Sequence, residues 1–184
     1  MPSSRPAIIS PVLDLVQALN PKSALDVGIG FGKWGYLLRE YMDAWFGRLK
    51  HDDWEAKIDG VEAYPGYISA LQQHVYDRIF QMPIEFAMGV LDEDHWDLIL
   101  MAEIIEHLSE EDGQKVLKWV WEHGRAIIIT TPLYDSPQGE QYGNPYEEHK
   151  SLWPPEKLHA AIGAGQYTVI QDRYLIYWAV KDKK

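Results

Sequence analysis

The sequence contains no cysteine, which excludes disulfides, thiolate nucleophiles and cysteine-based zinc sites. It is also poor in basic residues, with 17 lysines and arginines against 28 aspartates and glutamates, for a net charge of −11. A nucleic-acid backbone is bound by clustered basic side chains, and here the few basic residues are scattered. This balance argues against a nucleic acid as the main partner.

Long apolar segments are absent as well. No apolar run approaches the roughly 20 residues that a membrane-spanning helix needs. Residues 1–6 have neither the apolar core nor the cleavage pattern of a signal peptide. We therefore expect a cytoplasmic protein with no membrane partner. The 184 residues suit a single domain, 1–184, with a core large enough to fold without disulfides or metal ions.

Strand and helix patterns alternate along the chain. Short apolar runs predict five strands, at residues 23–27, 57–62, 78–82, 96–102 and 126–131. Helical spacing, proline positions and a capping serine predict helices over residues 8–19, 33–46, 65–76, from Ser109 onward, and over 155–162. Residues 167–171 and 174–180 are β-rich. Only two residues separate them, so they must pair as an antiparallel hairpin.

This order predicts an α/β fold with a doubly wound, Rossmann-like sheet of seven strands. The sheet should be mostly parallel with an antiparallel last strand, and helices should cover both faces. In such sheets, ligands bind at the carboxyl ends of the strands. A polar segment, residues 132–153, follows the fifth strand and must pass over that edge. Structureless loops of this length are usually functional, so we expect this segment to bind a substrate.

A glycine-rich turn, residues 26–32 (DVGIGFG), ends the first strand. Glycine permits positive φ and lets a ligand touch the backbone. The run from Gly30 to Gly35 also matches the dinucleotide fingerprint G-x-G-x-x-G. Asp26, however, would repel a pyrophosphate and attract a cationic ligand, such as the methionine portion of S-adenosylmethionine. Glu62, at the end of the second strand, can accept two hydrogen bonds from ribose hydroxyls, which either ligand would offer.

Taken together, these segments resemble the class I S-adenosylmethionine-dependent methyltransferases. Residues 26–32 look like the first motif of that superfamily and Val61-Glu62 like the second. Residues 96–108 (WDLILMAEIIEHL) are similar to its fourth-strand segment, and the terminal hairpin matches its reversed last strand. Residues 144–153 resemble a loop of bacterial small-molecule methyltransferases, with an Asn-Pro-x-x-x-His-x-x-x-Trp pattern. The resemblance covers about residues 7–181. It implies S-adenosylmethionine as the cofactor and methyl transfer to a small molecule, with oxygen as the expected target.

The resemblance also implies where the cofactor binds. The backbone near Gly28 and Gly30 would approach the methionine portion, Glu62 would hold the ribose, and residues 82–84 would flank the adenine. Many relatives carry an acid after the third strand, but here Met82-Pro83-Ile84 stands in that place. Adenine recognition must then rest on apolar contacts and backbone groups, or on another acid such as Glu85. The expected cofactor-binding residues are Asp26, Gly28, Gly30, Gly32, Glu62, Ala63, Met82, Pro83 and Met101.

Three residues are candidates for catalysis: Glu103, His107 and His149. Methyl transfer depends mainly on alignment, and a base is needed only if the acceptor must lose a proton. Histidine titrates in a suitable range, but His107 could equally pack against the following helix and His149 could tie down its loop. Glu103 either faces the cleft or supports another residue. Without a second suitably placed histidine, Glu103, Glu106 and His107 offer too few ligands, so no metal site is predicted.

Two rival functions remain open. The G-x-G-x-x-G match would also suit an NAD(P)-dependent oxidoreductase. The missing acid after the third strand would suit a non-catalytic module that binds S-adenosylmethionine without turnover. The sequence leaves the oligomeric state open.

Overall fold

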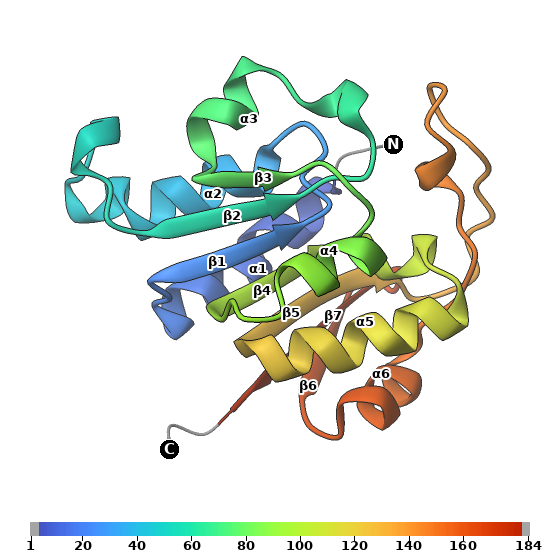
Figure 1. Ribbon diagram of the computed structural model, residues 1–184. Coiled ribbons are helices and arrows are strands. Elements are labelled where there is room, and N and C mark those ends of the chain that lie inside the picture. Colours follow the sequence, from blue (N-terminus) through green and yellow to red (C-terminus); the bar gives the residue numbers. More distant parts are fainter. Residues whose placement is uncertain (1–3, 182–184) are drawn as a thin grey trace.

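A seven-stranded sheet runs through the middle of the molecule in the order β3-β2-β1-β4-β5-β7-β6 (Figure 1). The computed structural model describes residues 4–181. Strands β1 to β5 are parallel, β7 is antiparallel to β5, and β6 is antiparallel to β7. The predicted fold class is confirmed, and the strand bounds agree with the prediction within two residues. The strands are β1 (Ser23–Val27), β2 (Lys57–Val61), β3 (Arg78–Phe80), β4 (Trp96–Ala102), β5 (Gly124–Pro132), β6 (Gln166–Ile170) and β7 (Tyr174–Val180).

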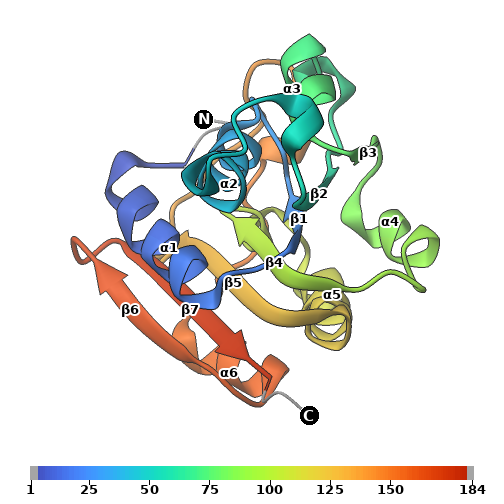
Figure 2. The same cartoon turned by 90° about the vertical axis from the view of Figure 1, so that its left-hand side faces the viewer.

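Helices cover both faces of the sheet (Figure 2). One face carries α1 (Pro6–Leu19), α2 (Lys33–Met42) and α3 (Ala70–Val75). The other carries α4 (Ile84–Val90), α5 (Glu110–His123) and α6 (Pro155–Ile162). Short 3₁₀ turns lie in the connections: η1 (Ala44–Phe46), η2 (His51–Asp53), η3 (Pro65–Tyr67), η4 (Ile105–His107) and η5 (Pro145–Glu147). Between residues 4 and 181, none of these helices combines the length and apolar character needed to cross a membrane.

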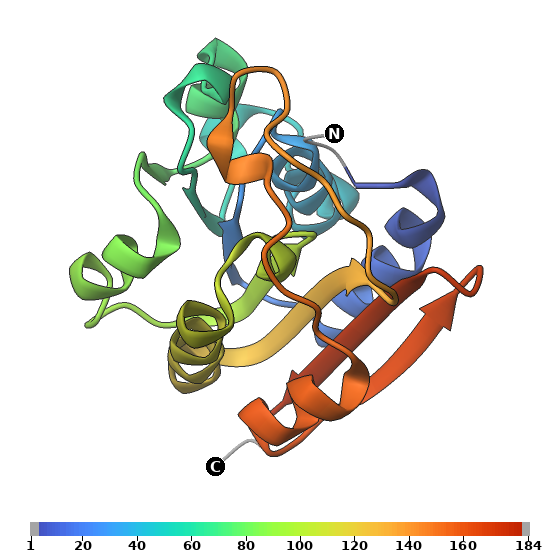
Figure 3. The ribbon, with the colours of Figure 1, turned by 90° about the vertical axis from the view of Figure 1, so that its right-hand side faces the viewer.

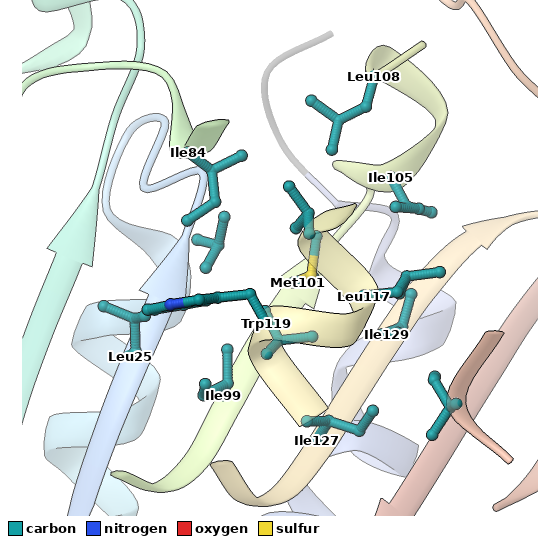
Figure 4. Close-up of a cluster of buried hydrophobic side chains, with 14 of the residues drawn as sticks. Leu25, Ile84, Ile99, Met101, Ile105, Leu108, Leu117, Trp119, Ile127 and Ile129 are labelled. Atoms are coloured by element: carbon teal, nitrogen blue, oxygen red, sulfur yellow. The ribbon is translucent and has the colours of Figure 1, made fainter. Parts of the chain in front are cut away.

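The central strands are apolar on both sides because each side faces a helical layer. In β1, Leu25 and Val27 belong to the hydrophobic cluster under α4 and α5, whereas Ala24 belongs to the cluster under α1 and α2. Figure 4 shows the first of these clusters, in which strand side chains meet Leu117 and Trp119 of α5. The alternation also assigns Asp26 to the α1–α2 side.

The helices differ from the prediction in three places. The helix expected over residues 33–46 ends at Met42, because Asp43 leaves the helical conformation. The helix expected over residues 65–76 is split, and its second part begins at a capping box between Ser69 and Gln72. Helix α4, which follows Pro83, was not predicted, since seven residues are too few for a clear helical period. As predicted, Ser109 caps α5, with its Oγ accepting a hydrogen bond from the backbone N–H of Asp112.

Candidate active site

A cavity of about 600 Å³ opens at the carboxyl edge of the sheet, beside the reversal of strand order between β1 and β4. Such a volume lies within the roughly 300–1,000 Å³ of small-ligand pockets, and the position is where doubly wound sheets bind ligands. Its walls come from the ends of β1, β2 and β4, the first turn of α4, and the loop of residues 132–153. Figure 3 shows this loop, in orange, crossing in front of the carboxyl ends of the strands.

The glycine turn forms one wall of the cavity. Gly28 has a φ of 84°, and a Cβ at this position would clash with Cδ1 of Ile104. The positive φ favours glycine at this position, and a larger residue would also have to displace the side chain of Ile104. Gly30 also has a positive φ, of 52°. Gly28 and Gly30 both line the cavity, and the side chain of Ile104 occupies the space in which a side chain of residue 28 would lie.

Glu62 connects two of the turns that line the cavity. Its Oε2 accepts a hydrogen bond from the backbone N–H of Gly30, and its Oε1 accepts one from the N–H of Tyr64, each at 2.8 Å. Burial raises the pKa of Glu62, and these backbone hydrogen bonds partly offset the rise. Each carboxylate oxygen has a further lone pair. The side chain is thus held in place and can still accept hydrogen bonds from a ligand.

The predicted cofactor residues divide into two groups. Gly28, Gly30, Glu62, Ala63 and Pro83 line the cavity, whereas Asp26, Gly32, Met82 and Met101 do not. Met101 is 1% exposed and belongs to the core beneath α5 (Figure 4). Gly32 is the residue before the first turn of α2. In place of Met82, the first turn of α4 supplies Glu85 and Phe86 to the wall.

Asp26 lies behind the cavity wall. Its side chain is fully buried and accepts a hydrogen bond from the hydroxyl of Tyr76. Burial raises the pKa of Asp26 to about 7, although the hydrogen bonds from Tyr76 and the backbone of Gly35 oppose the rise. This position differs from the direct contact with a cationic ligand that the sequence led us to expect, and the alternation of side chains along β1 is the reason.

Glu103 follows β4 and lines the cavity. It has a φ of 58°, a left-handed conformation that is strained for a residue other than glycine. Burial raises the pKa of Glu103, while a hydrogen bond with Ser4 and the positive charges of Arg5 and Lys33 oppose this. Ser4 also accepts hydrogen bonds from the side chains of Lys33 and Trp34. The segment before α1 therefore closes this side of the cavity.

His107 and His149 are far apart in the sequence and meet at the cavity wall. Their ring centroids are 4.8 Å apart, with an interplanar angle of 72°. Nδ1 of His107 lies 3.1 Å from the carbonyl oxygen of Glu148, and since a carbonyl can only accept, this nitrogen carries the hydrogen. Burial lowers the pKa of His107 to about 4 and also lowers that of His149. Both rings are therefore neutral at neutral pH.

Glu106 lies beside the two histidines. Potential ligand atoms of Glu106, His107 and His149 all lie within 4.8 Å of one another. The prediction that there is no metal site rested on the lack of a second suitably placed histidine. The structure brings His149 into that position.

Several cavity-lining residues carried no recognisable signal in the sequence. The hydroxyl of Tyr67 donates a hydrogen bond to Oε1 of Glu147, at 3.0 Å, and so links η3 to the loop of residues 132–153. Phe86 is 69% exposed and presents its ring beside the cavity. Neither tyrosine nor phenylalanine in such a position stands out from the many aromatic residues of the chain. The residues missed in this way are Ser4, Arg5, Lys33, Tyr67, Phe86 and Glu147.

No protein-family model and no curated protein matches the chain by sequence. Solved structures do match. An O-methyltransferase family protein from Burkholderia thailandensis has a TM-score of 0.64 and 10% identity over 96% of this chain, which spans only 57% of that protein. The methyltransferase domain of bacterial CtHen1 has a TM-score of 0.61 and 17% identity, covering 94% of this chain and 96% of that one. The N-terminal domain of EvdMO1, solved with SAH bound, has a TM-score of 0.66 and 13% identity, and the match covers 98% of this chain and 82% of that domain. The chain therefore has the fold of the class I S-adenosylmethionine-dependent methyltransferases.

Proposed function

We propose that this protein is a methyltransferase that takes a methyl group from S-adenosylmethionine and transfers it to an oxygen atom of a small molecule. Glu62 carries the proposal. Its buried carboxylate stands at the end of β2, facing the cavity and held by two backbone N–H groups, where it can accept both ribose hydroxyls of a nucleoside. The EvdMO1 domain, which shares this fold, was solved with SAH bound and supports the choice of cofactor.

The other walls of the cavity suit the remaining parts of that cofactor. Gly28 and Gly30, which have positive φ and line the cavity, would bring their backbone into contact with the methionine portion. Pro83 and the exposed ring of Phe86 offer apolar contact for the adenine, and Glu85 beside them can accept a hydrogen bond from its amino group. The cationic sulfonium is attracted by Glu62 and Glu103, which line the same cavity.

The chemistry asks mainly for alignment. S-adenosylmethionine supplies a methyl carbon already activated by its sulfonium. The protein must hold an acceptor oxygen in line with the carbon–sulfur bond and exclude water. The loop of residues 132–153 lines the acceptor side through Tyr134, Asn144 and Tyr146. The net charge of −11 favours a small acceptor over a nucleic acid.

Calorimetric titration with S-adenosylhomocysteine, in buffer containing EDTA, tests the cofactor. We expect saturable binding to the wild type. In Glu62→Gln, affinity should fall by about 10- to 100-fold, because one acceptor oxygen of a charged group becomes a donor that faces a backbone N–H. Glu122→Gln is the matched control, since Glu122 is exposed on α5 away from the cavity and should leave affinity unchanged.

Three results would contradict parts of the proposal. No binding at millimolar ligand would remove S-adenosylmethionine as the cofactor. Enhanced NADH fluorescence on mixing would favour an oxidoreductase instead. Saturable binding without methyl transfer to any member of a broad panel of hydroxyl-bearing acceptors would leave a non-catalytic binding module.

A further inference from the structure

Three side chains with metal-binding atoms converge on one point of the cavity wall. Glu106, His107 and His149, named here the His–Glu cluster, each offer one ligand atom, and these atoms lie within 4.8 Å of one another. Donors bound to one metal ion at about 2.1 Å are roughly 3–3.5 Å apart. The three atoms therefore need to approach one another by no more than about 1.8 Å, which side-chain rotation can provide.

A hydrogen bond to the backbone orients each of the two imidazole rings. The Nδ1–H of His107 donates to the carbonyl oxygen of Glu148, which leaves Nε2 with a free lone pair. His149 forms a hydrogen bond with the backbone of Ser136, which orients its ring. Metal-bound histidines commonly donate their other ring N–H to a backbone carbonyl in this way.

The carboxylate of Glu106 is the third donor of the His–Glu cluster. Its side chain is buried, and the hydroxyl of Thr131 donates to its Oε2 at 3.1 Å. A buried carboxylate is unfavourable unless it is protonated, paired with a positive charge or bound to a metal. A cation between Glu106 and the two imidazoles would satisfy it.

We infer that the His–Glu cluster binds a divalent first-row transition-metal ion, such as Mn²⁺ or Zn²⁺, through the carboxylate of Glu106, Nε2 of His107 and one ring nitrogen of His149. Two imidazoles among three ligands favour such an ion over Mg²⁺ or Ca²⁺, which prefer oxygen ligands. Three protein ligands leave at least one coordination position open. All three residues line the cavity, so the open position faces the space where an acceptor would lie.

The role of the ion rests on the proposed function. An acceptor hydroxyl bound to the ion would lose its proton to water more readily, because the metal stabilises the resulting oxyanion. The oxygen–carbon bond would then form as the carbon–sulfur bond of the methyl donor breaks.

Binding of Mn²⁺ to the EDTA-stripped protein can be measured by electron paramagnetic resonance during a titration. Binding of Zn²⁺ can be measured by competition against a chromophoric chelator. We expect one saturable site per chain. His149→Ala and Glu106→Gln should each lower the metal affinity by more than about 100-fold. Loss of a hydrogen bond that supports a ligand lowers the affinity by about 10- to 100-fold, and loss of the ligand itself should lower it further. His159→Ala is the matched control, because His159 is exposed on α6 and does not line the cavity.

Circular dichroism and thermal unfolding in EDTA show whether each variant is folded, and Glu106→Gln keeps the side-chain volume. Equal Mn²⁺ affinity in all four proteins, the absence of saturable binding up to millimolar metal, or tighter binding of Mg²⁺ than of Mn²⁺ would overturn the inference. Failure here is distinguishable from failure of the proposed function. S-adenosylhomocysteine binding is measured in EDTA, and metal binding is measured without any methyl donor.

Discussion

Replacing Asp26 by asparagine removes a carboxyl group that is fully buried beside Tyr76. Burial raises the pKa of this group from an ordinary value of 3.8 to about 7, so the folded state holds the proton more tightly than the unfolded state does. Below about pH 4 both states are protonated. Between about pH 4 and pH 7 the unfolded state releases the proton and the folded state keeps it. The contribution of Asp26 to stability therefore falls as the pH rises through this window.

The size of the effect follows from the pKa difference of about three units. Each unit corresponds to about 1.4 kcal/mol, so the full loss across the window is about 4 kcal/mol. Between about pH 4.5 and pH 8, where urea titrations are practical, about 3 kcal/mol of that loss remains. This is a large part of the roughly 5–15 kcal/mol that holds a typical domain together.

Urea unfolding at a series of pH values measures the difference. The free energy of unfolding of the wild type, minus that of Asp26→Asn, should decrease by about 3 kcal/mol from about pH 4.5 to pH 8. Asp14→Asn, which removes an exposed carboxyl group from α1, should track the wild type. Parallel stability curves for the wild type and Asp26→Asn would refute the reasoning. The same variant should bind S-adenosylhomocysteine nearly as well as the wild type, since Asp26 does not line the cavity.

Two further substitutions probe the walls of the cavity. Gly28→Ala should destabilise the protein by about 1–3 kcal/mol and greatly weaken S-adenosylhomocysteine binding, because the new Cβ meets the side chain of Ile104 and must adopt a positive φ. Gly89→Ala is the control, because a Cβ at this position of α4 has no neighbouring atom within 4 Å, and thermal unfolding should show an unchanged or higher stability. A loss of stability as large as that of Gly28→Ala would contradict the steric explanation. Tyr67→Phe removes the hydrogen bond to Glu147 and should speed proteolytic cleavage within residues 134–143, while the free energy of unfolding changes by only about 1 kcal/mol. An unchanged rate of cleavage would contradict the idea that Tyr67 anchors the loop.

The order of the strands and helices could be predicted because the apolar pattern of each segment matches the burial of that segment in the fold. Residues 96–102 and 174–180 coincide with β4 and β7 at both ends, since strands covered by helices or other strands are apolar along most of their length. Helix α4 could not be found, because its seven residues bury only Ile84 and Ala87 and no period emerges from two positions. Its first turn nevertheless forms the wall of the cavity that the sequence assigned to Met82.

The sequence by itself determined that Gly28, Gly30 and Glu62 would stand at the carboxyl edge of the sheet, because a parallel strand that ends in a turn can only end there. It did not determine that Asp26 faces away from the cavity, since an alternating strand has two faces and only the packed helices decide which one adjoins the ligand.

The meeting of His107 with His149 depended wholly on tertiary structure. The path of the loop is set by long-range backbone contacts, such as the hydrogen bond from the N–H of Lys150 to the carbonyl oxygen of Glu106, at 2.8 Å. No local pattern encodes such a contact. The sequence therefore pointed to the cofactor wall of the site, and folding assembled the histidines and Glu106 on the acceptor side.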